Sequence, residues 1–384
     1  MICKDCGKEF NITPGEMKFY EANNLKLPKR CPDCRTIRKK ANEAAERQRK
    51  WEDDEKRLKL LLDTLPFHQT TLNNLEFNNP DHLLVVIGNG FDIMHGVKSS
   101  YCDFQKTIGK HSSLRSDMET YLDVPADALW YNLEDSLGRL NYSMFLRPGI
   151  LDMWLEAFGA YNPDAQAADF FAAVETAIRP TFTIPQELKP KFKKWVKTLK
   201  VESGDRPFSM LHGDYRVLSF NYTEFIEDLY GAKFENVCYI HGCRKHRGKG
   251  KNELILGHVP GMEEEQWDKV KLKPIKFRNP YKREIFEAAI ETAIRETGWY
   301  DEETTKKCDE IIKKHSDFFD GLYDIEEVFV IGHSLAEVDY HYFEEIAKNC
   351  DAKWFIGYHS YDDMVRLVAI VEHLGLSDVT VFRT

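Results

Sequence analysis

The sequence has no apolar run that approaches the roughly eighteen residues a membrane-spanning helix needs. Its first ten residues, MICKDCGKEF, lack the apolar core of a signal peptide. Hydrophobic residues make up 42% of the 384 residues, an ordinary share for a protein with a sizeable core. We therefore expect a cytoplasmic protein without a membrane partner, which holds more than one unit or one large domain with an appendage.

Cysteine is sparse after the first forty residues. Five of the nine cysteines are scattered, which argues against a disulfide framework and fits a reducing compartment: Cys102, Cys238, Cys243, Cys308 and Cys350. The other four form two C-x-x-C pairs, Cys3 with Cys6 and Cys31 with Cys34. Four thiolates suit tetrahedral zinc in a closed structural site, with no vacant position for catalysis. We expect two knuckles separated by a β-hairpin.

Charge is unevenly distributed along the chain. Residues 1–50 carry 13 lysine and arginine residues against 7 aspartate and glutamate residues, a formal +6 within an overall −10. A basic head on an acidic body suggests a polyanionic partner for the head, although a solvated charged face explains the pattern equally well. The segment Thr36–Leu62 lacks glycine and proline and is rich in alanine and charged residues, which predicts a helix. We place a zinc ribbon at residues 1–38, a charged linker helix at 39–66 and an α/β domain at 80–384.

The stretch LLVVIGNGFD, Leu83–Asp92, dominates the body of the chain. Five apolar residues predict a strand buried on both faces of a parallel sheet. Gly88, Asn89 and Gly90 follow, where a turn into a helix would bring backbone close to a phosphate. The full G-x-G-x-x-G spacing is absent, so a buried strand with a tight turn is the alternative.

Further strands are expected to end in polar or glycine-containing turns. They span residues 216–221, 237–241, 253–258, 327–333, 352–358 and 379–382. Helices are expected at 92–109, 114–122, 126–140, 151–156 and 164–178. Alternation of this kind predicts an open α/β sheet, in which ligands bind beyond the carboxyl ends of the strands. Polar residues fall at those ends: Asn89, Asn221, His241, His258 and His333. Each of them could instead be structural, as we expect of His258 and His333, and Glu134 could point into a cleft.

Two family resemblances follow from these motifs. The segment CKDCGKEFNITPGEMKFYEANNLKLPKRCPDCR is similar to a small family of bacterial probable zinc-ribbon domains. The body resembles the bacterial abortive-infection family AbiH in the order of VVIGNGFDIMHGVKSSYCDF, WYNLEDSLG, SFNYTEFIE, CYIHG, LILGH and VFVIGHSLAEVDYHYF. This second resemblance covers nearly the whole body and implies a role in bacterial defence against phage.

A more distant likeness concerns mechanism. The motifs resemble those of sirtuin-like defence proteins that hydrolyse NAD, which implies a Rossmann-like fold with helical insertions, NAD as substrate and a homo-oligomer. The likeness places nucleotide-binding residues at Gly88, Asn89, Gly90, Phe91, Asp92, Tyr222, Gly242, Gly332, His333, Ser334 and Asp339. The first turn departs from the usual Gly-Ala-Gly, because Asn89 takes the place of the alanine and Phe91-Asp92 follows.

The chemistry of NAD cleavage assigns roles to two residues. Nicotinamide leaves as a neutral group from a cationic pyridinium, so no acid is needed. Asn221 would orient ribose and water, and His241 would take a proton. Asp92 or Asp339 would bind ribose hydroxyls or hold an imidazole. The basic loop from Arg244 to Lys251 could hold a phosphate.

Two other functions remain open. One is a nucleic-acid-directed effector such as a nuclease, although the sequence shows no compact carboxylate cluster for divalent ions. The other is a non-catalytic nucleotide-sensing module. The partners expected are a small nucleotide and, at the basic head, nucleic acid or a phage-derived trigger.

Overall fold

The structure is a computed structural model that describes residues 1–202, 204–245, 254–259 and 277–384. Two compact units make up the chain. The first consists of Met1–Pro66 with Ser360–Met364, and the second of Phe67–His359 with Val365–Thr384. Within the described ranges, no helix is both long and apolar enough to cross a membrane.

The first unit contains two helices, α1 (Pro14–Ala22) and α2 (Pro32–Thr64). Thr13 caps α1 with a capping box, in which its side chain accepts a hydrogen bond from the Glu16 backbone N–H and the Glu16 carboxylate accepts one from the Thr13 backbone. The long helix α2 confirms the helix predicted for Thr36–Leu62 and starts four residues earlier. No β-hairpin separates the two cysteine pairs in this fully described segment; α1 lies there instead, and an isolated bridge joins Ile2 to Glu9.

The second unit is built on a seven-stranded parallel sheet with strand order β1-β7-β6-β5-β2-β3-β4. The strands are β1 (His68–Thr71), β2 (Leu83–Ile87), β3 (Arg216–Ser219), β4 (Val237–Tyr239), β5 (Glu327–Ile331), β6 (Lys353–Tyr358) and β7 (Val379–Arg383). The predicted open parallel sheet is therefore confirmed. Strand β1 was not expected: it pairs with β7, so the α/β unit begins at Phe67 and not near residue 80.

Strand β2 is an interior strand of this sheet, and all five of its residues are buried. It pairs with β3 on one side and with β5 on the other. The chain thus runs outward from β2 through β3 to β4, and then crosses back to build β5, β6 and β7 on the opposite side. This reversal beside β2 is the topological switch point, where open α/β sheets bind their ligands.

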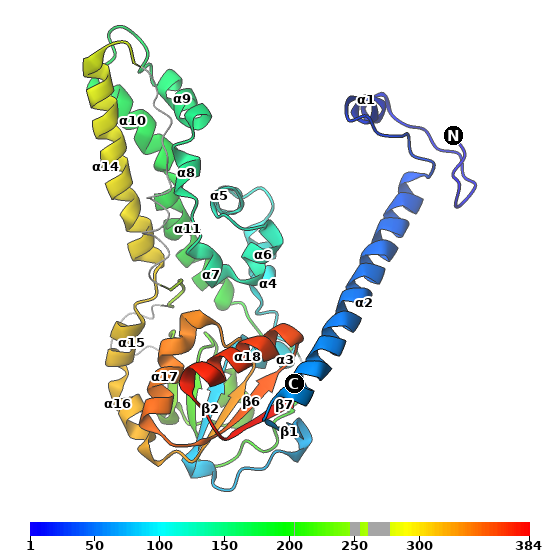
Figure 1. The fold of residues 1–384 in the computed structure, drawn as a ribbon, viewed down its shortest axis with the longest axis vertical. Helices are drawn as coiled ribbons and strands as arrows, with labels where there is room; N and C mark the ends of the chain where they lie inside the picture. Colours follow the sequence, from blue (N-terminus) through cyan, green and yellow to red (C-terminus); the bar gives the residue numbers. More distant parts are fainter. Residues whose placement is uncertain (203, 246–253, 260–276) are drawn as a thin grey trace. The chain divides into compact units, whose positions relative to one another are not determined.

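Helices follow β2 in a long insertion before β3. They are α3 (Asn89–Met94), α4 (Tyr101–Ile108), α5 (Ser113–Tyr121), α6 (Ala126–Tyr131), α7 (Leu133–Leu137), α8 (Tyr142–Phe145), α9 (Pro148–Ala157), α10 (Ala167–Ile178) and α11 (Pro180–Val196). The later helix α14 (Pro280–Thr304) packs against α10 and α11. Figure 1 shows α8 to α11 and α14 extending from the sheet as one arm, which we call the helical arm.

The remaining helices surround the sheet. They are α12 (Phe225–Tyr230), α15 (Cys308–Lys314), α16 (Ser316–Asp320), α17 (Tyr340–Asn349) and α18 (Tyr361–Leu374), with short 3-10 turns that include η5 (Glu337–Asp339). One predicted strand is wrong: over residues 254–258 only His258 forms an isolated bridge, to Thr305, and Glu253 lies outside the described residues.

Candidate functional site

Four cysteines of the first unit form a metal centre. The sulfur atoms of Cys3, Cys6, Cys31 and Cys34 all lie within 4.8 Å of one another. The Cys6 and Cys31 Sγ atoms are 3.7 Å apart. Zinc–sulfur bonds of about 2.3 Å in a tetrahedron require sulfur atoms about 3.8 Å apart, so the cysteines fit zinc.

The second cysteine pair sits on a helix and not on a knuckle. Cys31 is the N-cap of α2 and Cys34 lies in its first turn, which fixes both sulfurs on rigid backbone. The Cys31 N–H donates to Cys3 Sγ at 3.3 Å, and this bond lowers the pKa of Cys3 to about 6. The neighbouring sulfurs raise the pKa of Cys34, a repulsion that a divalent cation removes.

The Gly88–Gly90 turn packs against the turn after β5. A Cβ on Gly88 would lie 2.6 Å from His333 Cα, and one on Gly90 would lie 2.7 Å from Gly332 Cα. The N–H groups of Gly88 and Gly90 donate to the carbonyls of Ile331 and Gly332. The close approach of the two backbones is enough to explain why both positions are glycine. Phosphate binding at this turn stays a prediction.

Asp92 and Asn221 form a buried pair behind this turn. The Asn221 amide nitrogen donates to Asp92 Oδ1 at 2.8 Å, and the Thr223 hydroxyl donates to Asp92 Oδ2 at 2.6 Å. Burial raises the pKa of Asp92 to about 7, against the opposing effect of both donors. Because the amide nitrogen is held, the amide orientation of Asn221 is fixed, and its Oδ1 is buried with no hydrogen-bond partner among the described residues.

A buried lysine organises the charged part of the site. The Lys306 ammonium, in a residue only 1% exposed, donates to Glu134 Oε2 at 2.6 Å and to Asp339 Oδ1 at 3.1 Å. Burial lowers the pKa of Lys306, but the two carboxylates outweigh it and raise that pKa overall. Burial by itself would raise the pKa of Asp339. The nearby Lys306 and His333 outweigh burial, so the pKa of Asp339 is lowered overall. One ammonium thus faces two carboxylates.

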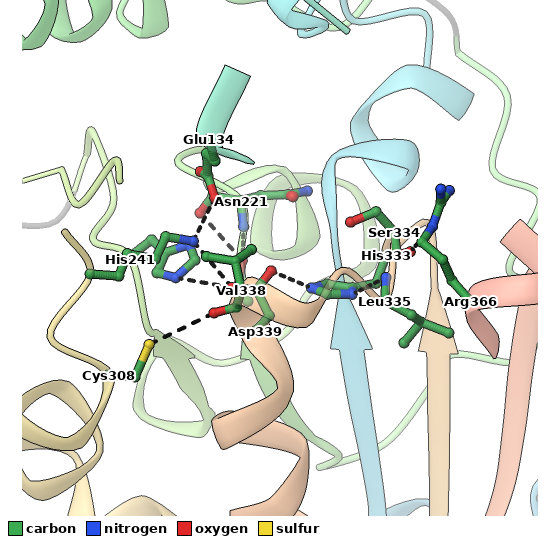
Figure 2. Close-up of polar contacts among 12 residues, drawn as sticks. Glu134, Asn221, His241, Cys308, His333, Ser334, Leu335, Val338, Asp339 and Arg366 are labelled. Atoms are coloured by element: carbon green, nitrogen blue, oxygen red, sulfur yellow. Dashed lines mark hydrogen bonds and ion pairs between the residues drawn. The ribbon is translucent and has the colours of Figure 1, made fainter. Parts of the chain in front are cut away.

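Two histidines flank Asp339 (Figure 2). His333 Nδ1 accepts a hydrogen bond from the Leu335 N–H at 2.9 Å, so its ring proton lies on Nε2, which is 3.4 Å from Asp339 Oδ2. His241 Nε2 lies 3.8 Å from Asp339 Oδ1, too far for a hydrogen bond, and has no hydrogen-bond partner within the described ranges. Burial and then Lys306 hold the pKa of His241 well below its usual value. His241 is therefore a neutral base.

Two tyrosines complete the surroundings of Glu134. Tyr101 donates to Glu134 Oε1 at 2.8 Å. Tyr222 has a single phenolic proton, which faces the Ile255 carbonyl at 2.7 Å and Glu134 Oε1 at 3.3 Å. Burial raises the pKa of both phenols well above the usual value, so both remain donors. We call Glu134, Lys306, Asp339, His241, His333, Tyr101 and Tyr222 the strand-end cluster.

Several predicted site residues lie elsewhere. Phe91 is fully buried in an aromatic group with His95, Phe208 and Tyr230. Asn89 and Ser334 are exposed, and Gly242 provides a positive φ of 82° after β4. The contacts of His258 fit a structural role, since its two ring nitrogens form hydrogen bonds with the Val259 carbonyl and with Thr304 Oγ1.

The basic loop offers a structural arginine in its described part. Arg244 pairs with Glu224 through two hydrogen bonds of 2.9 and 3.1 Å and also donates to the carbonyls of Val196 and Leu199. Lys245 pairs with Asp228 at 2.9 Å. The rest of the predicted loop, 246–251, lies outside the described residues.

Sequence patterns predicted only part of this cluster. Lys306 and Tyr101 were not anticipated, because a lysine after a long helix and a tyrosine in a short one have no distinguishing pattern. For Glu134 the sequence allows either a place in the packed core or a side chain that points into a cleft. A surface hollow of about 700 Å³ on the helical arm, lined in part by Phe182 and Trp299, shares no residue with the cluster.

Family comparisons account for both units. Residues 84–358 match the family described as Bacteriophage abortive infection AbiH. The chain belongs to the AbiH family. Residues 1–43 match a probable treble clef domain, which agrees with a second cysteine pair carried by a helix. No curated protein and no solved structure matches this AbiH chain. The family match ties the chain to abortive-infection defence, as the motifs predicted.

Proposed function

We propose that this AbiH chain is an abortive-infection effector that hydrolyses NAD at the bond between nicotinamide and ribose. One observation carries the proposal: the strand-end cluster holds a buried excess of carboxylate charge beside a neutral imidazole with an unpaired nitrogen. The cluster lies at the switch point of the sheet, where such folds bind nucleotides.

The charge of the cluster suits the transition state of this reaction. As the ribosyl C1′–N bond breaks, nicotinamide leaves as a neutral base and positive charge develops on the ribose. Glu134 and Asp339 carry two negative charges against the single positive charge of Lys306. In a site shielded from water, the remaining negative charge stabilises an oxocarbenium-like ribose.

Water attack needs a base, and His241 provides one. A hydrogen bond to the backbone of Phe220 holds the imidazole ring, and Nε2 has no partner among the described residues. In a neutral ring with its proton on the other nitrogen, Nε2 can accept a proton. Water adds to C1′ and gives one proton to Nε2, so the products are nicotinamide, ADP-ribose and a proton that His241 returns to solvent.

Asn221 and the neighbouring turns would position the nucleotide. Asp92 fixes the Asn221 amide, and the free Oδ1 can accept a hydrogen bond from a ribose hydroxyl or from water. The amides of Gly88 and Gly90 already donate to carbonyls, so recognition of the pyrophosphate would depend on other groups, such as the exposed side chain of Asn89.

A nuclease is the alternative, with the basic treble clef domain holding nucleic acid or a phage-derived trigger. The arrangement around Lys306 favours ribosyl hydrolysis, because the ammonium occupies the place between two carboxylates where a divalent ion would bind. A non-catalytic nucleotide-sensing role is a second alternative to the hydrolase. A homo-oligomer and a cytoplasmic location accompany the hydrolase proposal.

The experiment follows nicotinamide and ADP-ribose release from NAD by purified protein, with and without phage lysate. We expect cleavage by the wild type and a loss of about 100-fold or more in His241→Ala, the range for removal of a general base. Asn221→Ala should lose about 100-fold through misplacement of the nucleotide. His95→Ala is the matched control, a fully buried histidine bonded to Phe91 and Tyr230. It should lower the thermal midpoint while keeping cleavage per folded molecule. Intact NAD under every condition would refute the proposal, and Mg²⁺-dependent cleavage of tRNA or single-stranded DNA would replace it with the nuclease.

A further inference from the structure

Lys306 is the most deeply buried charged group of the site and has two carboxylate partners on different parts of the fold. Glu134 belongs to α7, in the insertion after β2. Asp339 ends η5, in the segment after β5. Lys306 itself stands two residues beyond α14, the long helix of the helical arm. A single ammonium therefore joins three segments that are distant in sequence.

We propose that Lys306 is a positioning residue for the reaction, which holds Asp339 in place through one hydrogen bond and ties the site to the helical arm through the helix that precedes it. This inference rests on the proposed function, because it names the group that assembles the same site.

The backbone around Lys306 explains how α14 controls its place. The Lys306 N–H donates to the His258 carbonyl, and the His258 N–H donates to the Thr304 carbonyl, which forms a small ladder at the end of α14. A Cβ on Gly257 would lie 2.2 Å from the Thr304 carbonyl oxygen, so this crossing is tight. A shift of α14 along its axis would move Lys306 with it.

The contacts of Asp339 show why its position matters. Its Oδ1 faces both Lys306 at 3.1 Å and His241 Nε2 at 3.8 Å, and its Oδ2 faces His333. Without the ammonium, Asp339 would face only the two histidines and would carry an unpaired charge in a buried site. Displacement of a positioned group by about 1 Å can lower a rate about 100-fold.

A purely structural salt bridge would make a different prediction. Neutralising a buried lysine alone leaves Glu134 and Asp339 unpaired, which destabilises a fold strongly whatever the function. Removing the opposing charge at the same time, in Glu134→Gln with Lys306→Met, relieves most of that loss, because Tyr101 can still donate to the amide oxygen of Gln. Stability and activity then separate.

The charge of Lys306 also sets the pH range in which His241 stays neutral. The titratable or charged groups that face His241 are Lys306, Asp339, His333, Tyr222 and Tyr342. Lys306 is the charged group with the largest effect, and it lowers the pKa of His241. Loss of the ammonium raises that pKa, so the acid limb of residual activity moves to higher pH.

The test compares Lys306→Arg, Lys306→Met, Glu134→Gln and the double variant with the wild type, by thermal midpoint, NAD cleavage from pH 5 to 9 and protection of cells in a plaque assay. Lys189→Met is the matched control, since Lys189 pairs with Glu303 at 2.8 Å on the helical arm. We expect about a 100-fold loss of cleavage in Lys306→Met relative to the wild type, and in the double variant relative to Glu134→Gln alone. We further expect a recovered thermal midpoint in the double variant, partial cleavage in Lys306→Arg and an acid limb shifted upward.

The two proposals fail separately in this experiment. A double variant as active and protective as the wild type, or residual activity with an unshifted acid limb, overturns the role of Lys306 while NAD cleavage by the wild type stands. A wild type that protects cells without consuming NAD refutes the hydrolase. The plaque assay then still decides on Lys306, because protection by Lys306→Arg together with none by the double variant supports the positioning role.

Discussion

The buried carboxyl of Asp92 should make the stability of the fold depend on pH, an effect that can be tested without knowing the substrate. Its carboxyl is 2% exposed and accepts hydrogen bonds from Asn221 and Thr223. Burial raises its pKa from the ordinary 3.8 to about 7. In Asp92→Asn the side chain keeps its size and cannot ionise, so the pH-dependent part of the stability is removed.

The sign and size follow from proton linkage. Between pH 4 and 7 the unfolded chain has lost the Asp92 proton while the folded chain keeps it. The folded state binds more protons there, and stability falls as the pH rises. One pKa unit corresponds to about 1.4 kcal/mol, so the fall amounts to about 4 kcal/mol and levels off above pH 7.

The assay is the thermal midpoint of unfolding of wild type and Asp92→Asn at pH 5, 6, 7 and 8. We expect the variant to gain stability relative to the wild type as the pH rises, until the difference levels off near pH 7. Asp103→Asn is a control whose stability relative to the wild type should not change from pH 5 to 8, because a lowered pKa confines the proton linkage of Asp103 to pH values below about 4. Partial burial raises the pKa of Asp103, but Lys106 and Ser100 outweigh it and lower that pKa. Midpoints of wild type and Asp92→Asn that run parallel over this range would refute the reasoning.

Two other predictions concern the turns and the metal. Gly332→Ala should prevent stable folding of the α/β unit, because a Cβ there would lie 2.1 Å from the Phe91 nitrogen at a φ of +62°. Gly375 also has a positive φ, +66°, but a Cβ there would meet no atom within 4 Å. Gly375→Ala should therefore lower the free energy of unfolding by only about 1 kcal/mol. Equal losses for the two variants in urea unfolding would contradict the close-approach argument. Cys34→Ser, or chelation, should abolish bound zinc measured by mass spectrometry and open residues 1–43 to protease. The melting transition of the α/β unit should stay unchanged, and retained zinc in Cys34→Ser would count against the four-cysteine site.

The sheet was predictable because its strands carry their own signal. Leu83–Ile87 has five consecutive apolar residues, and the structure makes all five buried members of β2. Strand β1 has the sequence HQTT, and most of its residues are exposed. It joins the sheet only by pairing with β7, and no local sequence pattern predicts that pairing. The hairpin expected between the cysteine pairs was wrong because Thr13, Pro14 and Glu16 start a helix there.

The candidate site was predictable only where it follows strand ends. Asn221, His241 and His333 each lie two residues after the end of a strand, β3, β4 and β5 respectively, and parallel topology brings those ends together. Tyr101 reaches the same place from α4, and Lys306 from the segment that follows α14, so their positions depend on how those two helices pack. Such packing is set by tertiary contacts, which a single sequence does not display.

The spacing of the cluster along the chain bears on synthesis of a protein that would harm its own cell. Asp92 and Asn221 are 129 residues apart, and Glu134 is 172 residues from Lys306. On the ribosome, β2 and β3 can pair while β5, Lys306 and Asp339 have yet to be made. Incomplete chains therefore lack the lysine bridge and the flanking carboxylate. Under the proposed function, an effector made in this order would gain activity only once its chain is complete.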